Sequence, residues 1–340
     1  RTRGHTCGMG RLLVASLLVA IMVVTAPGSE AEASQRFRVV LLVDPEGSND
    51  DFWAIPTAGL RRAARELPVD AHVVAQPTRT SYASTLRGLA RQRHDLIVAG
   101  FALQFESVLE VARQFPNIRC AVPDVRSDEM RPWPANVQAL GYREEEIGYV
   151  VGFLAGLMER ERDGPDVVGS VGGVRVPPVE RFIAGFRAGA RRASPRIRLL
   201  NGFAQSFSDP DACATVARGQ IAKGAGVVFQ VAGGCGLGAL AVAKEEGVSG
   251  IGVDADQSSL GPHVLTSALK RIDLTVFNAI QLLVQGRLKT GGDTLVGLRE
   301  GGLGLGKVSP RVPPRILART LRIRDQIVAG RITGIPDELR

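Results

Sequence analysis

Short apolar runs alternate with longer amphipathic stretches along most of the chain. The run at 37–43 (FRVVLLV) is apolar at successive positions, which is typical of a strand buried on both faces of a parallel sheet. After a polar loop that begins at Asp44, residues 54–67 place apolar side chains at helical spacing and predict a helix. The same alternation predicts strands at 71–75, 96–99 and 120–123, and helices at 82–92, 105–115 and 144–160.

The alternation starts again in the second half of the chain. It predicts strands, separated by helices, at 166–171, 197–203, 227–231 and 249–253. The segment at 264–268 is compatible with a further strand, and a helix is predicted at 272–285. A strand, a helix and a strand in succession form the unit of a parallel sheet. Two such series, which meet near residues 140–150, therefore predict an α/β fold with two doubly wound parallel-sheet lobes.

Glycine and aspartate gather where the predicted strands end. Ligands of doubly wound sheets bind beyond the carboxyl ends of the strands. These positions therefore form one candidate site, to which both halves of the chain contribute. They are Asp44 with its loop, Gly100, Phe101, Asp124, Gly172, Gly173, Gly233, Gly234 and Asp254.

The composition excludes several classes of protein. Hydrophobic residues make up 45% of the 340 residues and charged residues 22%, which rules out a disordered chain or a multi-span membrane protein. The formal net charge is +8, from 42 basic and 34 acidic residues. Because the basic residues are scattered, we interpret them as a solvated surface and expect no nucleic-acid partner.

Two features of the chain bear on a membrane. Basic residues precede an apolar run at 12–25, and a small-residue stretch follows that ends in Ala31-Glu32-Ala33. This order is typical of a secretory signal peptide, so we expect residues 1–33 to be removed and the chain to be exported, with an uncleaved anchor as the alternative.

The second feature is a stripe of glycines at a four-residue spacing within 144–160, which we interpret as a surface for close packing on a sheet.

Cysteine and histidine offer little to a catalytic or metal site. Removal of residues 1–33 would take away Cys7 and leave Cys120, Cys213 and Cys235. These three are too widely spaced for a metal-site pattern, and three thiols cannot all pair within one chain. We therefore expect each to be a small buried residue. His72, His94 and His263 are isolated in the sequence, so no zinc or other metal site is expected.

One motif keeps an enzyme open as an alternative. Gly234, Gly236 and Ala239 match the G-x-G-x-x-A form of the dinucleotide fingerprint, and Asp254 ends the next predicted strand. An NAD-type enzyme normally carries this motif in its first strand–helix–strand unit, however, and here it lies late in the chain. The sequence offers no candidate nucleophile beside the carboxylates, so ligand binding is favoured over catalysis and no cofactor is expected.

Several distinctive segments follow one another in a fixed order. They are VVGSVGGVRVPPVERFIAGFRAGA at 167–190, SFSDP at 206–210, FQVAGGCGLG at 229–238, GVDADQ at 252–257 and IVAGRI at 327–332. With these motifs the chain resembles, over residues 36–336, the basic membrane protein family of ABC-transporter substrate-binding proteins, which includes purine nucleoside receptors.

The resemblance implies a type I periplasmic binding protein, whose two α/β lobes are joined by crossovers and close on a ligand. The lobes are expected to comprise 36–143 with 254–288 (lobe I) and 144–253 with 289–340 (lobe II). The crossovers are expected near 140–147, 252–258 and 285–296. The resemblance also implies a monomer that binds a small polar, nucleoside-like molecule outside the cytoplasm and passes it to an ABC permease in the membrane.

Particular residues take roles from the same resemblance. Phe229 is expected to stack on a base, and Asp124, Asp254 and Lys270 are expected to contact polar groups of the ligand. Three further expected ligand contacts lie in or beside the matching segments. They are Gly233, Gly234 and Asp256.

The first loop departs from the family pattern Asn-Asp-x-Ser-Phe-Asn. This chain reads SNDDFW at 48–53, so either Asn49 or Asp50 stands in place of the family aspartate, and Trp53 replaces an asparagine. Trp53 offers a larger stacking face but only one N–H donor. We expect the two faces of a planar ligand to be covered, from both lobes, by Phe52, Trp53 and Phe229.

Overall fold

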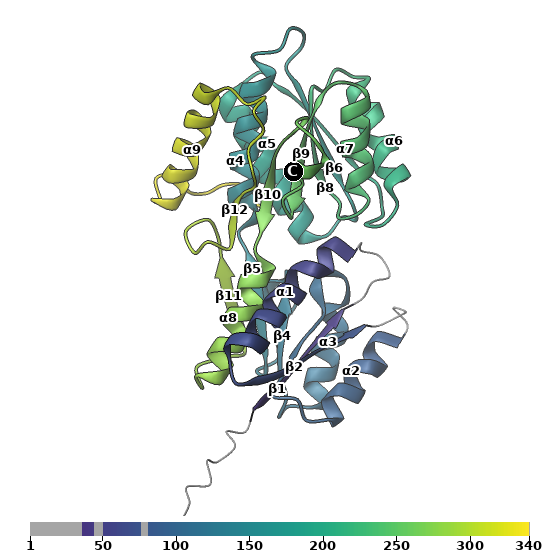
Figure 1. The fold of residues 1–340 in the computed structure, drawn as a ribbon, viewed down its shortest axis with the longest axis vertical. Coiled ribbons are helices and arrows are strands. Elements are labelled where there is room, and N and C mark those ends of the chain that lie inside the picture. The colour runs from purple at the N-terminus through teal and green to yellow at the C-terminus, as the bar shows by residue number, and fades with distance from the viewer. Residues whose placement is uncertain (1–35, 44–49, 76–80, 340) are drawn as a thin grey trace, which may run out of the picture. The chain divides into compact units, whose positions relative to one another are not determined.

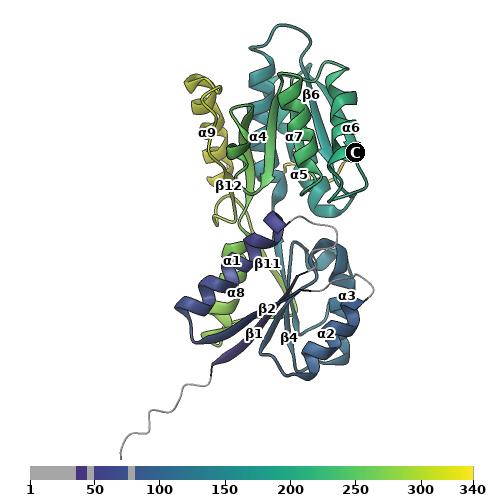
Figure 2. The same ribbon diagram turned by 45° about the vertical axis from the view of Figure 1, so that its right-hand side comes forward.

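The strands form two six-stranded sheets, and helices flank each of them (Figures 1 and 2). The structure is a computed structural model that describes residues 36–43, 50–75 and 81–339. The expected signal peptide at 1–33 lies outside these residues, as do Asp44 and Asn49 of the first loop. Within the described residues, the predicted α/β fold with two doubly wound lobes is confirmed.

The first sheet, with its helices, forms lobe I and is parallel throughout. Its strand order is β11 (Gly292–Val296), β5 (Val137–Tyr142), β4 (Arg119–Pro123), β3 (Leu96–Val98), β1 (Phe37–Val43) and β2 (Val69–Ala75). The two faces are covered by α1 (Asp50–Glu66) with α8 (Ile272–Val284), and by α2 (Tyr82–Arg91) with α3 (Phe101–Gln114). Leu41 packs in the first of these apolar layers and Leu42 in the second, so β1 is buried on both faces as its sequence predicts.

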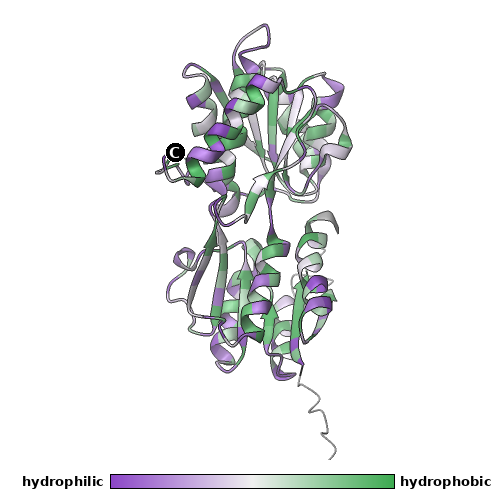
Figure 3. Ribbon diagram, turned by 60° about the vertical axis from the view of Figure 1, so that its left-hand side comes forward, coloured by the Kyte–Doolittle hydropathy of each residue, from purple (hydrophilic) through white to green (hydrophobic). Residues whose placement is uncertain are grey.

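The second sheet, with its helices, forms lobe II. Its strand order is β12 (Leu303–Leu305), β10 (Val264–Lys270), β9 (Ser249–Asp254), β8 (Val227–Val231), β6 (Val167–Gly172) and β7 (Arg198–Phe203). Its strands pair in parallel except for β12, which is antiparallel to β10. The helices are α4 (Glu144–Glu159), α5 (Pro177–Ala193), α6 (Pro210–Ile221), α7 (Gly236–Glu245) and α9 (Pro314–Val328). Hydrophobic residues follow the strands of both sheets, and polar residues mark the outer helix faces (Figure 3).

The glycine stripe of α4 packs against a helix and not, as predicted, against a sheet. A Cβ atom on Gly152 would collide with the carbonyl oxygen of Phe186 in α5, and one on Gly189 of α5 would collide with the carbonyl oxygen of Tyr149 in α4. The two helix backbones are therefore in direct contact. Among the helices of the described residues, none is both long enough and apolar enough to cross a bilayer.

The chain passes between the lobes after Tyr142, after Lys270 and after Val296. Two expected lobe assignments differ from this pairing. β10 was expected in lobe I but pairs with β9 of lobe II, so the crossover expected near 252–258 lies after Lys270 instead. β11 was expected in lobe II but pairs with β5 of lobe I. The apolar pattern of a strand marks it as buried but does not identify its partner, which is why both assignments failed.

The cysteines also depart from the prediction. Cys213 in α6 and Cys235 at the start of α7 form a disulfide, with their Cα atoms 5.5 Å apart. Both lie in the apolar cluster between these helices and the second sheet. An odd number of thiols leaves one over, but it does not prevent the other two from pairing. The remaining described cysteine, Cys120, is buried in β4 as a free thiol.

Candidate ligand-binding site

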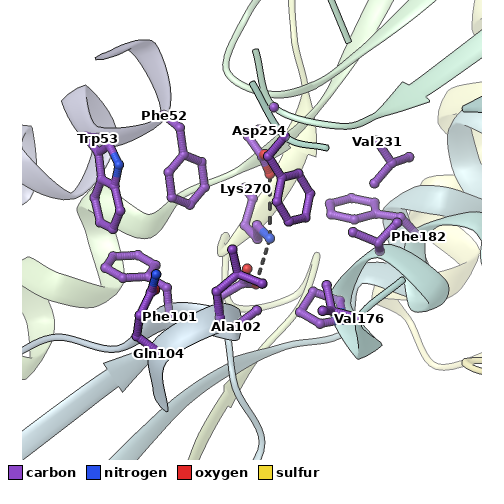
Figure 4. A pocket seen from close by; sticks show the side chains of 16 residues that line it. Phe52, Trp53, Phe101, Ala102, Gln104, Val176, Phe182, Val231, Asp254 and Lys270 are labelled. Carbon is purple, nitrogen blue, oxygen red and sulfur yellow. Dashed lines mark hydrogen bonds and ion pairs between the residues drawn. The ribbon is translucent and has the colours of Figure 1, made fainter. Parts of the chain in front are cut away.

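A pocket lies where strands of both sheets end at their carboxyl termini (Figure 4). Asp124 follows β4, Asp254 ends β9 and Lys270 ends β10. The starts of α1, α3 and α5 supply most of the apolar lining. The described lining comprises Phe52, Trp53, Phe101, Ala102, Leu103, Gln104, Asp124, Val176, Pro178, Val179, Phe182, Phe207, Val231, Gly233, Asp254 and Lys270.

Three rings from lobe I, Phe52, Trp53 and Phe101, form an aromatic wall. The ring centroids of Trp53 and Phe101 lie 4.6 Å apart with their planes at 85°, and those of Phe52 and Trp53 lie 5.4 Å apart at 78°. Edge-to-face contacts of this kind are favourable, so the rings hold one another in place. The sequence analysis placed Phe101 among the strand-end positions of the candidate site but assigned it no ligand contact, and the structure places it in the pocket lining.

Opposite charges from both lobes, Asp124, Asp254 and Lys270, form a polar floor. The ammonium of Lys270 lies 2.7 Å from Asp124 Oδ1 and 3.6 Å from Asp254 Oδ1. The Lys270 side chain is only 3% exposed. Three residues that the sequence suggested separately are thus brought together by the fold. One carboxylate oxygen, Asp254 Oδ1, has no hydrogen-bond donor among the described residues.

A second layer of charges, which the sequence reasoning missed, lies behind the floor. Glu144 is fully buried and accepts a hydrogen bond of 2.6 Å from Arg181 Nε, while its other oxygen lies 4.0 Å from the Lys270 ammonium. Arg181 also donates to Glu129 at 2.8 Å. The sequence feature that could have predicted this layer is Arg181 itself, a charged residue on an otherwise apolar helix face, next to Phe182 in the motif at 167–190.

Burial shifts the pKa values of the floor residues. Burial raises the pKa of Asp124 to about 7, although the Lys270 ammonium opposes the shift. Burial also raises the pKa of Asp254, again against Lys270. Burial disfavours the Lys270 ammonium, but Asp124, Asp254 and Glu144 outweigh it and raise the pKa of Lys270. Lys270 therefore stays charged at neutral pH, whereas Asp124 is close to its titration midpoint.

The two floor carboxylates stand on an uncommon backbone. Asp124 has a φ of 66° and Asp254 a φ of 62°, both in the left-handed region that side chains other than glycine rarely adopt. Aspartate tolerates this region better than most residues, and such conformations cluster at ligand sites. The sharp turn after each strand aims both carboxylates into the pocket rather than onward along the sheet.

Several expected contacts do not line the described pocket. Phe229 is fully buried in β8, where its ring packs 5.1 Å from Phe186 and 6.2 Å from Phe182. Its neighbour Phe182 lines the pocket in its place. Asp256 accepts hydrogen bonds from the backbone of Ser258 and Lys307 instead. Gly234 is also absent from the lining. Asp50 is the first residue of α1, and the structure does not describe its side chain.

The glycines of the dinucleotide-like motif serve packing. A Cβ atom on Gly236 would collide with the side chain of Gln230, and one on Gly238 would collide with the backbone of Pro210. Cys235, between the motif's glycines, is held in the disulfide. These contacts leave the motif no surface for a pyrophosphate. The residues described here contain no group of three histidine, cysteine or acidic side chains placed to hold a metal.

Comparison with known proteins agrees with this architecture. Residues 37–337 match the family described as ABC transporter substrate-binding protein, PnrA-like. Basic membrane protein A1 of Borrelia garinii is 31% identical over 317 residues, which cover 90% of each chain. An uncharacterized lipoprotein of Pyrococcus furiosus is 28% identical over 86% of this chain and 76% of its own.

A solved structure shares both the fold and part of the sequence. The ABC transporter system solute-binding protein of Aeropyrum pernix K1 superposes with a TM-score of 0.78 at 25% identity, and the match covers 88% of this chain and 94% of that one. The expected type I periplasmic binding protein fold is thereby confirmed.

Proposed function

The chain belongs to the family of PnrA-like ABC transporter substrate-binding proteins, and we propose that its pocket captures a small, polar, nucleoside-like ligand for import. The ligand would pass from this chain, acting as a monomer, to an ABC permease in the membrane. The proposed role is binding without chemical change, because the described lining holds no serine, threonine or cysteine and the Lys270 amine stays protonated at neutral pH.

The pairing of an aromatic wall with a polar floor is the observation that carries this proposal. A nucleoside has a planar base and a sugar with several hydroxyls. The base fits beside Phe52, Trp53 and Phe101, because aromatic rings pack favourably on flat π systems. Hydroxyls both donate and accept, so they can donate to Asp254 and accept from Lys270.

Capture is proposed to involve closure of the lobes. The three crossovers are narrow connections, and the ligand would lie between the aromatic wall of lobe I and Phe182 and Phe207 of lobe II. Ligand binding can drive closure only through its higher affinity for the closed form. Small-angle scattering of the chain with and without saturating ligand measures this. We expect the radius of gyration to fall, and an unchanged value contradicts closure.

The site of action is proposed to be outside the cytoplasm. The order of basic, apolar and small residues at 1–33 supports export with cleavage after Ala33. The Pyrococcus furiosus relative is named a lipoprotein, which supports attachment to a membrane. Sequencing the N-terminus of the secreted chain tests the cleavage, and an N-terminus that retains residues 1–33 contradicts it.

Calorimetry with a nucleoside panel tests the ligand class. The panel contains inosine, guanosine, adenosine and uridine, with ribose alone as the control for the sugar. We expect Asp254→Ala to weaken the binding of the preferred nucleoside about tenfold or more, because a buried ligand hydroxyl that loses its carboxylate acceptor costs ~1–3 kcal/mol. Asp256→Ala is the matched control, since Asp256 contacts backbone amides outside the pocket. Binding of none of the nucleosides contradicts the proposed class.

A further inference from the structure

The indole N–H of Trp53 is a buried donor without an acceptor. Trp53 is 8% exposed, and its Nε1 atom has no hydrogen-bond partner among the residues that the structure describes. An unpaired buried donor is rare and costs free energy in the ligand-free chain. The chain's other tryptophan, Trp133, shows the usual arrangement, because its Nε1 donates to the carbonyl oxygen of Val137 at 2.9 Å.

The unpaired donor belongs to a pocket residue whose ring is fixed. Trp53 lines the pocket, and Phe101 and Phe52 contact its ring edge-to-face, so the indole cannot turn to find another acceptor. Figure 4 shows the indole at the pocket edge, with its nitrogen on the side that faces Phe52. The N–H is thus held ready for a group that the described chain does not supply.

We propose that Trp53 determines specificity by selecting ligands whose planar ring presents a hydrogen-bond acceptor, a carbonyl oxygen or a ring nitrogen, to the aromatic wall. This inference rests on the proposed function and narrows it. An amino group at the same edge would set donor against donor and leave both unpaired, which is an efficient way to reject a ligand. Asparagine in this position would accept as well as donate, whereas the indole only donates.

Two phenylalanine variants separate this role from a structural one. Trp53→Phe removes a donor that has no partner, so the ligand-free chain loses some ring packing but no hydrogen bond, and we expect about tenfold weaker binding of inosine. Trp133→Phe removes a donor that has a partner outside the pocket, so we expect lower stability and unchanged affinity. If the Trp53 ring serves only packing, Trp53→Phe should lower stability without the specific loss of inosine affinity.

Ligand analogues identify the acceptor. Purine riboside lacks the 6-carbonyl oxygen of inosine, and 7-deazainosine lacks its ring nitrogen N7. If Trp53 donates to one of these atoms, the analogue that lacks this atom should bind the unaltered chain about tenfold more weakly than inosine does. The same analogue and inosine should bind the Trp53→Phe chain with equal affinity, because that chain has already lost the interaction. The Trp133→Phe chain keeps Trp53 as its one tryptophan, and inosine should change its fluorescence.

The outcomes distinguish this inference from the proposed function. Inosine binding that is equally tight in the unaltered chain and in Trp53→Phe overturns the role of Trp53 and leaves the nucleoside class standing. The role of Trp53 is also overturned if each analogue loses the same binding free energy, relative to inosine, in the unaltered chain and in Trp53→Phe. No binding of any nucleoside by the unaltered chain overturns the ligand class and this inference with it.

Discussion

The ammonium of Lys270 lies 2.7 Å from a carboxylate oxygen of Asp124, and this ion pair joins the last residue of β10 in lobe II to the residue after β4 in lobe I. Both side chains are almost completely buried. The pair is therefore a contact between lobes inside the ligand pocket. A ligand that takes either residue as a partner also alters a contact that joins the lobes.

Loss of the Lys270 charge should destabilise the ligand-free chain. Lys270→Met leaves Asp124, Asp254 and Glu144 close together without their shared ammonium. We expect the free energy of unfolding to fall by about 3–5 kcal/mol in urea denaturation, because removing one partner leaves buried charges uncompensated. The control is Arg218→Ala, which removes an exposed ion pair and should cost less than ~1 kcal/mol. Similar losses in the two variants would count against a buried charge cluster.

The stability of the ligand-free chain should depend on pH through Asp124. Its folded pKa of about 7 lies above its ordinary value of 3.8, so the folded chain holds this proton more tightly than the unfolded chain does. The resulting stability is fully present below pH 3.8 and is lost as the pH rises through 7. Asp124→Asn stays neutral throughout.

Urea denaturation at a series of pH values between 4 and 8 measures this effect. We expect the free energy of unfolding of the unaltered chain to fall relative to that of Asp124→Asn, by at most about 1.4 kcal/mol per pH unit. Titrating groups away from the polar floor are common to both chains, so the difference reports Asp124 together with its effect on the neighbouring floor charges. Parallel pH profiles would show that Asp124 titrates in its ordinary range.

A methyl group should have opposite effects at two helical glycines. Gly152→Ala places a Cβ against the carbonyl oxygen of Phe186 and forces α4 and α5 apart, so we expect a loss of about 1–3 kcal/mol. Gly219→Ala lies in α6, where the new Cβ meets no atom within 4 Å beyond the nearby backbone of its own helix and its chain neighbours, and should stabilise the chain by about 0.5–1 kcal/mol. Thermal unfolding of both variants provides the measurement. A neutral Gly152→Ala would contradict backbone contact between the helices.

The sequence predicted the individual strands better than their partners. Residues 39–43 are all apolar, and successive side chains point to opposite faces of the sheet. This pattern is typical of a strand that lies between two layers of helices. β10 is also apolar and was found as a strand. Its lobe is decided by pairing with β9, which the apolar pattern of β10 does not specify. The partner of β11 is β5, a strand far away in the sequence.

The candidate site shows the same division. Asp124 and Asp254 were predictable because carboxylates after strands reach a shared edge, and Lys270 came from the family resemblance. Glu144 was not predictable, because an acidic residue at the start of a helix is usually exposed and helps to cap it. The structure is needed to show that Arg181 donates a hydrogen bond to Glu144. The role of Phe229 also came from the family resemblance, and the structure places this residue fully buried in β8, outside the described pocket lining.

The disulfide between Cys213 and Cys235 makes the pocket depend on where the chain folds. Cys235 stands two residues after Gly233, which lines the pocket, so the bridge ties this loop to α6. Thiols stay reduced in the cytoplasm and pair in oxidising compartments. With the proposed export, the loop beside the pocket is untied while the chain is in the cytoplasm, and the disulfide ties it to α6 only afterwards. Affinities measured on reduced, cytoplasmically produced protein would describe a precursor, not the receptor that meets the ligand.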